Sequence, residues 1–95
     1  MTYTRESAQD LAMTVLLHMA ARPDLIAGFL EASGLQPQDL RQAAGNPDIA
    51  LHILDYLLED DRRVLDAAAE LQVAPGELMQ ARTALAGPGS YGWEI

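Results

Sequence analysis

Glycine and proline residues divide this chain into short segments, and this punctuation limits every regular element to a few turns. The interruptions are Pro23, Gly34 with Pro37, Gly45 with Pro47, Pro75 with Gly76, and the run from Gly87 to Gly89. Proline cannot continue a helix, and glycine commonly ends one. Between these positions apolar residues recur three and four apart, as on one face of a helix, and strand-like alternation is weak. The pattern predicts an all-α fold, a compact bundle of five or six short helices.

The expected helices carry signals at their ends. They cover residues 5–21, 24–33, 37–44, 47–59, 61–72 and 75–86. Thr4 or Ser7 is expected to cap the first helix, and Gly34 is expected to end the second in the left-handed conformation. Either Asp60 or Asp61 is expected to cap the fifth helix.

The fourth segment differs from the others because apolar residues occupy almost its whole circumference. They are Ile49, Ala50, Leu51, Ile53, Leu54, Tyr56, Leu57 and Leu58. Asn46 followed by Pro47 is a cap-then-proline start for a helix. Because a helix that is apolar all round is usually buried, this segment is predicted to be the central helix of the bundle.

The chain also matches itself when it is shifted by 38 residues, which lays residues 8–45 over 46–83. The identical pairs are Asp10/Asp48, Ala12/Ala50, Leu16/Leu54, Pro37/Pro75, Leu40/Leu78, Gln42/Gln80 and Ala43/Ala81. A long helix, a second helix and a short helix that begins with proline would then occur twice. The alternative is that Ala- and Leu-rich helices align by chance. A true duplication predicts two copies of a three-helix unit that superpose with the same order of helices.

The length of 95 residues is enough for one domain with a modest core. We expect residues 1–86 to form a single helical domain and residues 87–95 to form a Gly- and Pro-rich C-terminal tail. The tail carries Tyr91, Trp93 and Ile95, which are costly to leave in water, and these are the candidate partner-binding residues. The alternatives are that Trp93 folds back onto the bundle or that the tail frays as a terminus.

The balance of charge excludes several classes of site. The chain has 14 acidic and 6 basic residues, which gives a net charge of −8 at pH 7. All the basic residues are arginine, and lysine and cysteine are absent. This composition removes Schiff-base lysines, thiol nucleophiles, disulfides and thiolate metal sites. A strongly negative chain repels phosphate backbones, so no nucleic acid partner is expected.

The longest apolar stretch, residues 11–21, is shorter than the roughly 17–25 residues that a membrane-spanning helix needs. No membrane association is therefore expected. The first ten residues lack the pattern of a signal peptide, which favours a cytoplasmic protein.

The chain has two histidines, His18 and His52. Thr14 and His18 are four residues apart, as are His52 and Tyr56, so each pair shares a helix face. One interpretation is a small polar cluster where the first and fourth helices meet, with a pH-sensitive histidine. The other is two partly exposed residues that bond to water or to each other. Without thiolates or His-x-x-x-His spacing, no metal site is expected.

Residues 67–78 have the outline of a helix-turn-helix motif: a helix, a tight turn and a second helix. The second helix offers Gln80, Arg82 and Thr83 as base-reading side chains. Two packed short helices also occur in most α bundles, and the net charge opposes DNA binding. A transcriptional regulator is therefore an alternative and not the main expectation.

Two motifs in the chain are distinctive. They are Gly34-Leu35-x-Pro37-x-Asp39-Leu40-Arg41 and the helical Leu54-Asp55-Tyr56-Leu57-Leu58. Through these motifs the chain resembles, over roughly residues 7–86, a family of short alphaproteobacterial proteins named domain of unknown function 3572. The resemblance implies a small helical protein with no assigned activity, so it provides no catalytic residues. The tail after Gly87 lies outside it.

Together these features favour a non-catalytic protein–protein interaction or regulatory module over an enzyme. No catalytic, cofactor-binding or metal-binding residue is predicted, and no cofactor is expected. The acidic surface favours an unknown protein partner with a basic surface, and a homodimer is also plausible because the first and fourth helices are unusually apolar. Two alternatives remain: an acidic helix-turn-helix-like transcriptional regulator and a binder of a small apolar ligand in the bundle core.

Overall fold

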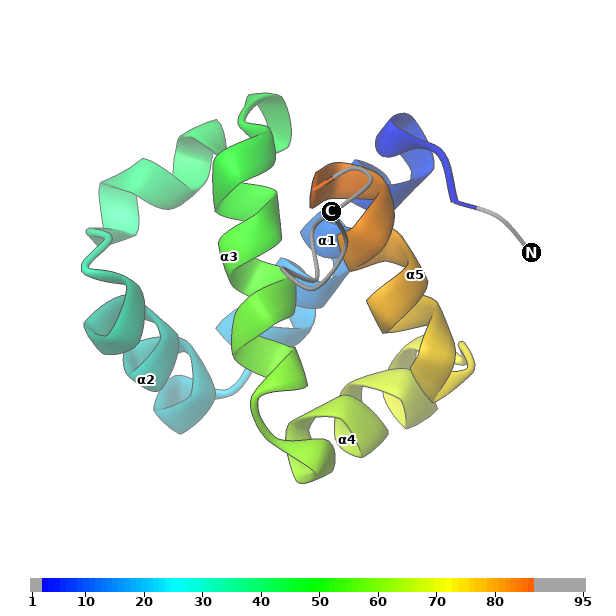
Figure 1. The fold of residues 1–95 in the computed structure, drawn as a ribbon. Helices are drawn as coiled ribbons and strands as arrows, with labels where there is room; N and C mark the ends of the chain where they lie inside the picture. Colours follow the sequence, from blue (N-terminus) through cyan, green and yellow to red (C-terminus); the bar gives the residue numbers. More distant parts are fainter. Residues whose placement is uncertain (1–2, 87–95) are drawn as a thin grey trace.

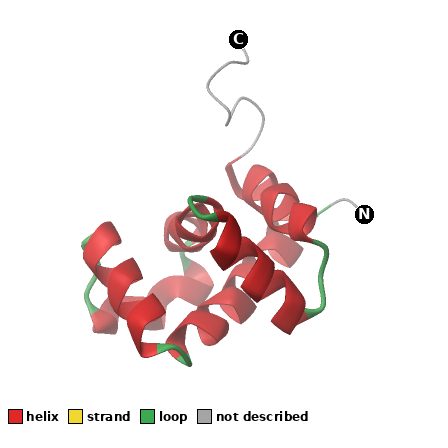
Figure 2. Cartoon of the chain, turned by 90° about the horizontal axis from the view of Figure 1, so that it is seen from below, coloured by secondary structure: helices red, strands yellow, loops and turns green. Residues whose placement is uncertain are grey.

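The computed structural model describes residues 3–86, and within that range all regular structure is helical. The elements are α1 (Arg5–Ala20), α2 (Pro23–Ser33), the 3-10 helix η1 (Pro37–Gly45), α3 (Pro47–Leu58), α4 (Asp61–Leu71) and α5 (Pro75–Ala86). Figure 2 shows these helices joined by short loops. The predicted all-α bundle is confirmed. The tail and its candidate residues Tyr91, Trp93 and Ile95 lie outside the described residues.

Helix α3 lies at the centre of the bundle (Figure 1). Helices α2 and η1 lie on one side of it, α4 and α5 lie on the other side, and α1 passes behind it. The most extensive packing joins α1, α3 and α5. The buried residues of α3 are Ile49, Ala50, Ile53, Leu54, Tyr56 and Leu57. The prediction of a central, buried fourth helix is therefore confirmed.

The core combines large aliphatic side chains with fully buried alanines. The largest fully buried side chains are Phe29, Met19, Ile53, Leu54, Leu57, Leu78 and Val15. Each contributes roughly 1.5–3 kcal/mol relative to an exposed position. Ala8 and Ala12 of α1 and Ala50 of α3 are also fully buried, and their small side chains let the helix backbones approach closely.

The ends of α1 and α2 are fixed by the predicted residues. The hydroxyl oxygen of Thr4 accepts a hydrogen bond from the backbone N–H of Ser7 at 3.1 Å. The Ser7 hydroxyl oxygen in turn accepts from the backbone N–H of Thr4 at 2.9 Å, so the two candidate caps act together. Gly34 ends α2 with a φ of 76°, a left-handed conformation that glycine adopts without strain.

The starts of α3 and α4 follow the same logic. Asn46 caps α3 by accepting from the backbone N–H of Asp48 at 2.9 Å. Asp60 caps α4 by accepting from the backbone N–H of Arg62 at 2.8 Å. The fifth expected helix is α4. Of its two predicted caps, Asp60 is the cap, and Asp61 is the first residue of the helix.

The third predicted helix is present, but it is a 3-10 helix. Its inward-facing residues are compatible with this geometry. Leu40 is half-buried and Ala43 is fully buried. They are three residues apart, which matches three residues per turn. Pro37 and the Asn46-Pro47 pair also confine the segment, so it has little length in which to gain α-helical hydrogen bonds.

The predicted order of helices occurs twice, as α1, α2, η1 and then α3, α4, α5. The third members differ in type, since η1 is a 3-10 helix and α5 is an α-helix. Superposition of the two halves stays a prediction.

No single helix in the described part of the chain is long and apolar enough to cross a membrane. Within residues 3–86, the pair α1 and α2 taken together meets the requirements of length and composition, and the chain bends by 119° between these helices.

Candidate functional site

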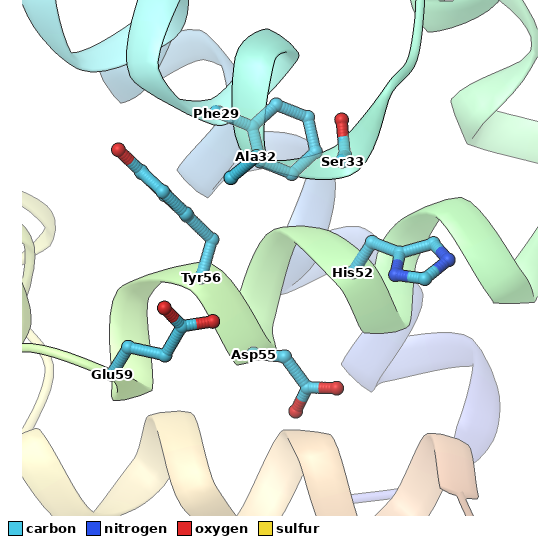
Figure 3. A pocket seen from close by; sticks show the side chains of 7 residues that line it. All are labelled: Phe29, Ala32, Ser33, His52, Asp55, Tyr56 and Glu59. Atoms are coloured by element: carbon cyan, nitrogen blue, oxygen red, sulfur yellow. The ribbon is translucent and has the colours of Figure 1, made fainter.

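A pocket of about 190 Å³ opens between α2 and α3. Its lining residues are Phe29, Ala32, Ser33, His52, Asp55, Tyr56 and Glu59. Figure 3 shows Tyr56 reaching from α3 toward α2, with Asp55 and Glu59 farther along the α3 side. Phe29 is 1% exposed and Tyr56 is 9% exposed, so the two aromatic rings form the floor of the pocket.

The position of Tyr56 depends on a glycine in the facing helix. A Cβ atom built on Gly28 would lie 2.4 Å from the Tyr56 hydroxyl oxygen, which is closer than atoms can approach. The ring centroids of Tyr56 and Phe29 are 5.6 Å apart at an interplanar angle of 67°, an edge-to-face arrangement. Gly28 thus makes room in α2 for the end of the Tyr56 side chain.

Arg63 of α4 holds Tyr56 from another direction. Its guanidinium carbon lies 3.9 Å from the centroid of the Tyr56 ring, a cation–π contact. Its Nη1 also donates a hydrogen bond to the Tyr56 carbonyl oxygen at 2.8 Å. The ring is therefore fixed by three helices: α3 carries it, α2 receives it, and α4 covers it.

The polar groups of the pocket fall into two kinds. Asp55 is paired, because Arg82 of α5 donates from Nε to its Oδ1 at 2.7 Å. Among residues 3–86, the structure gives no hydrogen-bond or ionic partner to the side chains of Glu59 and His52, both of which are exposed, or to the Tyr56 hydroxyl. The hydroxyl of Ser33 is used locally, since it donates to the Leu30 carbonyl oxygen and accepts from the backbone N–H of Leu35.

A second polar site lies where α1 packs against α4. His18 is 3% exposed, and its Nδ1 lies 2.7 Å from Oε2 of Glu70. Arg22 forms an ion pair with the same carboxylate oxygen and donates to the His18 carbonyl oxygen at 2.8 Å. Hydrogen bonds from His18 and Arg22 lower the pKa of the Glu70 carboxyl from its ordinary value. These three side chains bond to one another, and His18 and Arg22 also line a second pocket of about 270 Å³.

The prediction of a polar cluster between the first and fourth expected helices, which are α1 and α3 in the structure, is wrong. His18 bonds to Glu70 of α4, and the Thr14 hydroxyl donates to the Asp10 carbonyl oxygen in its own helix. His52 instead lines the α2–α3 pocket. The alternative of two partly exposed histidines is also wrong for His18, which is buried. The physical reason is that α1 and α3 meet mainly through small and apolar residues, so both imidazoles point to other neighbours.

Sequence reasoning also missed the α2–α3 pocket, although one local signal was present. An isolated glycine inside a helical pattern weakens the helix and often has a packing reason. Gly28 stands in the middle of α2, next to Phe29. It marks the point where Tyr56 enters, but the sequence does not say which helix faces it.

The chemistry of the α2–α3 pocket suits a cationic group. It combines the Glu59 carboxylate with the hydroxyl of the buried Tyr56 and the buried ring of Phe29. Among residues 3–86, no group of three or more His, Asp or Glu side chains is arranged to hold a metal ion. A ligand held here would therefore be recognised through hydrogen bonds, charge and aromatic contact.

Comparison with known proteins gives one match. The sequence model of a family described as "Protein of unknown function (DUF3572)" matches residues 5–88. The match includes every helix of the structure and agrees with the resemblance carried by the two sequence motifs. No curated protein and no solved structure matches the chain.

Proposed function

The chain belongs to the DUF3572 family of proteins of unknown function, and we propose that it is a non-catalytic module that binds a partner protein through its acidic helical surface. The observation that carries the proposal is the α2–α3 pocket, in which the carboxylate of Glu59, which has no partner within residues 3–86, accompanies the aromatic side chains of Phe29 and Tyr56. A net charge of −8 favours the approach of a partner with a basic surface. We place this role in the cytoplasm, as the sequence predicts.

The size of the pocket supports a protein partner over a free small molecule. Pockets for drug-sized ligands usually enclose roughly 300–1,000 Å³. The α2–α3 pocket, at about 190 Å³, suits the end of one side chain presented by a larger surface. This comparison disfavours the binder of a small apolar ligand, as does the polar rim of the pocket.

The helix-turn-helix alternative is disfavoured by the engagement of Arg82. This side chain was one of three candidate base readers, and it forms an ion pair with Asp55 at 2.7 Å. Moving it to a base edge would leave the Asp55 carboxylate without that partner. The net charge of the chain opposes DNA binding further.

Affinity capture from a lysate of the source organism tests the proposal. The bait carries its tag at the N-terminus, and four forms are compared: the unmodified chain, a chain truncated after Ala86, and the variants Glu59→Gln and Glu31→Gln. Glu31 is exposed on α2 and does not line the pocket, so Glu31→Gln makes the same change in charge elsewhere.

We expect a basic partner that is retained by the truncated chain and by Glu31→Gln and is depleted by Glu59→Gln. Capture of no partner would contradict the proposal. If the partner is lost only when the chain is truncated, the interface would be assigned to Tyr91, Trp93 and Ile95. Recovery of a second copy of this chain would replace the partner with a homodimer.

A further inference from the structure

We propose that the α2–α3 pocket binds one arginine side chain of the partner protein. This inference rests on the proposed function, because it assumes that the acidic surface meets another protein. It goes further by naming the chemical group that is bound and the residues that recognise it: Glu59 and Tyr56.

The first argument concerns hydrogen-bond acceptors that the chain itself leaves unused. Tyr56 is nine-tenths buried, and its hydroxyl has no hydrogen-bond partner among residues 3–86. A buried polar group without a partner is costly, so a ligand that reaches it gains affinity. The Glu59 carboxylate, also without a partner in this range, lines the same pocket. These groups therefore favour a ligand that carries several hydrogen-bond donors and a positive charge.

The second argument favours arginine over lysine. A guanidinium group carries five N–H donors in a plane, is weakly hydrated and packs well on aromatic rings. The chain shows this preference on the same tyrosine, where the guanidinium of Arg63 covers the Tyr56 ring and donates to its carbonyl oxygen. A lysine ammonium is a compact and strongly hydrated charge, so it would lose more hydration in this pocket.

The third argument concerns the source of the arginine. A second copy of the chain also carries exposed arginines, but each copy has a net charge of −8, so two copies repel each other at long range. A partner with a basic surface is attracted instead. The pocket is therefore assigned to a different protein, and a second copy is an outcome that the test must exclude.

The experiment is an NMR titration of the full-length, nitrogen-15-labelled chain with N-acetylarginine N-methylamide. The lysine equivalent carries the same charge and serves as the matched probe. We expect amide shifts concentrated at Ser33, His52, Tyr56 and Glu59, and tighter binding of the arginine probe than of the lysine probe.

Variants make the assignment specific. Glu59→Gln is expected to weaken binding of the arginine probe about twofold to fivefold, which is the range for one exposed ion pair. Tyr56→Phe keeps the ring and removes the hydroxyl, so it should also weaken binding. Glu31→Gln should leave the affinity unchanged.

Three results would overturn the inference: equal binding of the arginine and lysine probes, equal weakening by Glu59→Gln and Glu31→Gln, or shifts centred away from α2 and α3. Concentration-dependent shifts of the same amides without probe would show a second copy in the pocket and would also overturn it. Selective binding of the arginine probe supports the inference even if the lysate capture yields no partner. In that case only the proposed function fails.

Discussion

Two helix crossings in this bundle carry corresponding residues and differ in their chemistry. His18 of α1 points to α4, and Tyr56 of α3 points to α2. The two residues are 38 positions apart, the shift at which the chain matches itself. At the α1–α4 crossing the polar groups satisfy one another, whereas at the α2–α3 crossing a hydroxyl and a carboxylate have no partner within residues 3–86. Pockets adjoin both crossings within that range, but only the α2–α3 pocket contains a hydroxyl and a carboxylate that are available to a ligand in this way.

The facing helices explain this difference. Under the same shift, Glu70 of α4 corresponds to Ala32 of α2. At this position α2 therefore has no carboxylate that could bond to Tyr56. Asp66 of α4 corresponds to Gly28, which gives Tyr56 the space to approach α2. These differences, together with Tyr56 in place of His18 and Phe29 in place of Ala67, accompany an ion-paired crossing on one side and an aromatic one on the other.

The largest expected effect is a difference in the free energy of unfolding between variants at the two crossings. Tyr56→Ala removes a ring that packs on Phe29 and under Arg63, and it should lower the free energy of unfolding by about 3–5 kcal/mol. His18→Ala should cost less, because the Glu70 carboxylate is 43% exposed and keeps its ion pair with Arg22. Urea unfolding of both variants measures the difference. An equal or larger loss at His18 would show that the ion-paired crossing is the more important one.

A smaller effect tests the contact between Gly28 and Tyr56. Gly28→Ala should destabilise the protein by about 1 kcal/mol, because the overpacking cost of roughly 1–3 kcal/mol exceeds the gain in helix propensity of about 1 kcal/mol. In a Tyr56→Phe background the hydroxyl is gone and the nearest ring carbon lies 3.6 Å away, so the same change should stabilise the protein. Additive effects in the double-mutant cycle would rule out this contact.

The pH dependence of stability probes the ion-paired crossing. The pKa of Glu70 is lowered, first by the hydrogen bond from His18 and then by that from Arg22. A carboxyl with a lowered pKa stabilises the fold above its ordinary pKa, and this contribution is lost as the pH falls through the folded-state pKa. Unfolding measured from pH 7 down to pH 3 should therefore show a shallower loss of stability in Glu70→Gln than in the unmodified chain. Glu77, whose pKa is also lowered, leaves a residual slope. Identical profiles would mean that the Glu70 ion pair does not contribute.

The smallest effect is expected at the rim of the pocket. Glu59→Gln should change the free energy of unfolding by less than about 0.5 kcal/mol, because its exposed side chain has no partner within residues 3–86. Thermal unfolding compared with Glu31→Gln measures this. A large loss would assign Glu59 a structural role.

Local signals predicted the helices well, because caps and breakers act on neighbouring residues. Gly34, the Asn46-Pro47 pair and Asp60 all act at the ends where the sequence placed them. Which helices cross, and at which residue, depends on packing between distant segments. For that reason the sequence did not predict the partner of His18 or the meeting of Tyr56 with Gly28.

The same limit applies to the candidate site. The motif containing Asp55 and Tyr56 was recognised from the sequence, within the segment predicted to be the central, buried helix. Its leucines do pack in the core, but Asp55 and Tyr56 line a pocket whose other wall comes from α2. The facing wall is set by the tertiary fold, so residue spacing alone did not reveal the pocket.

The most direct test of the account makes the same change in charge at each crossing. The affinity for N-acetylarginine N-methylamide is measured by NMR titration in Glu59→Gln and in Glu70→Gln. The account predicts that Glu59→Gln weakens binding about twofold to fivefold, whereas Glu70→Gln leaves it unchanged because its carboxylate is already used within the chain. Equal weakening by both variants, or weakening by Glu70→Gln alone, would contradict the distinction between a carboxylate that is bonded within the chain and one that is available to a ligand.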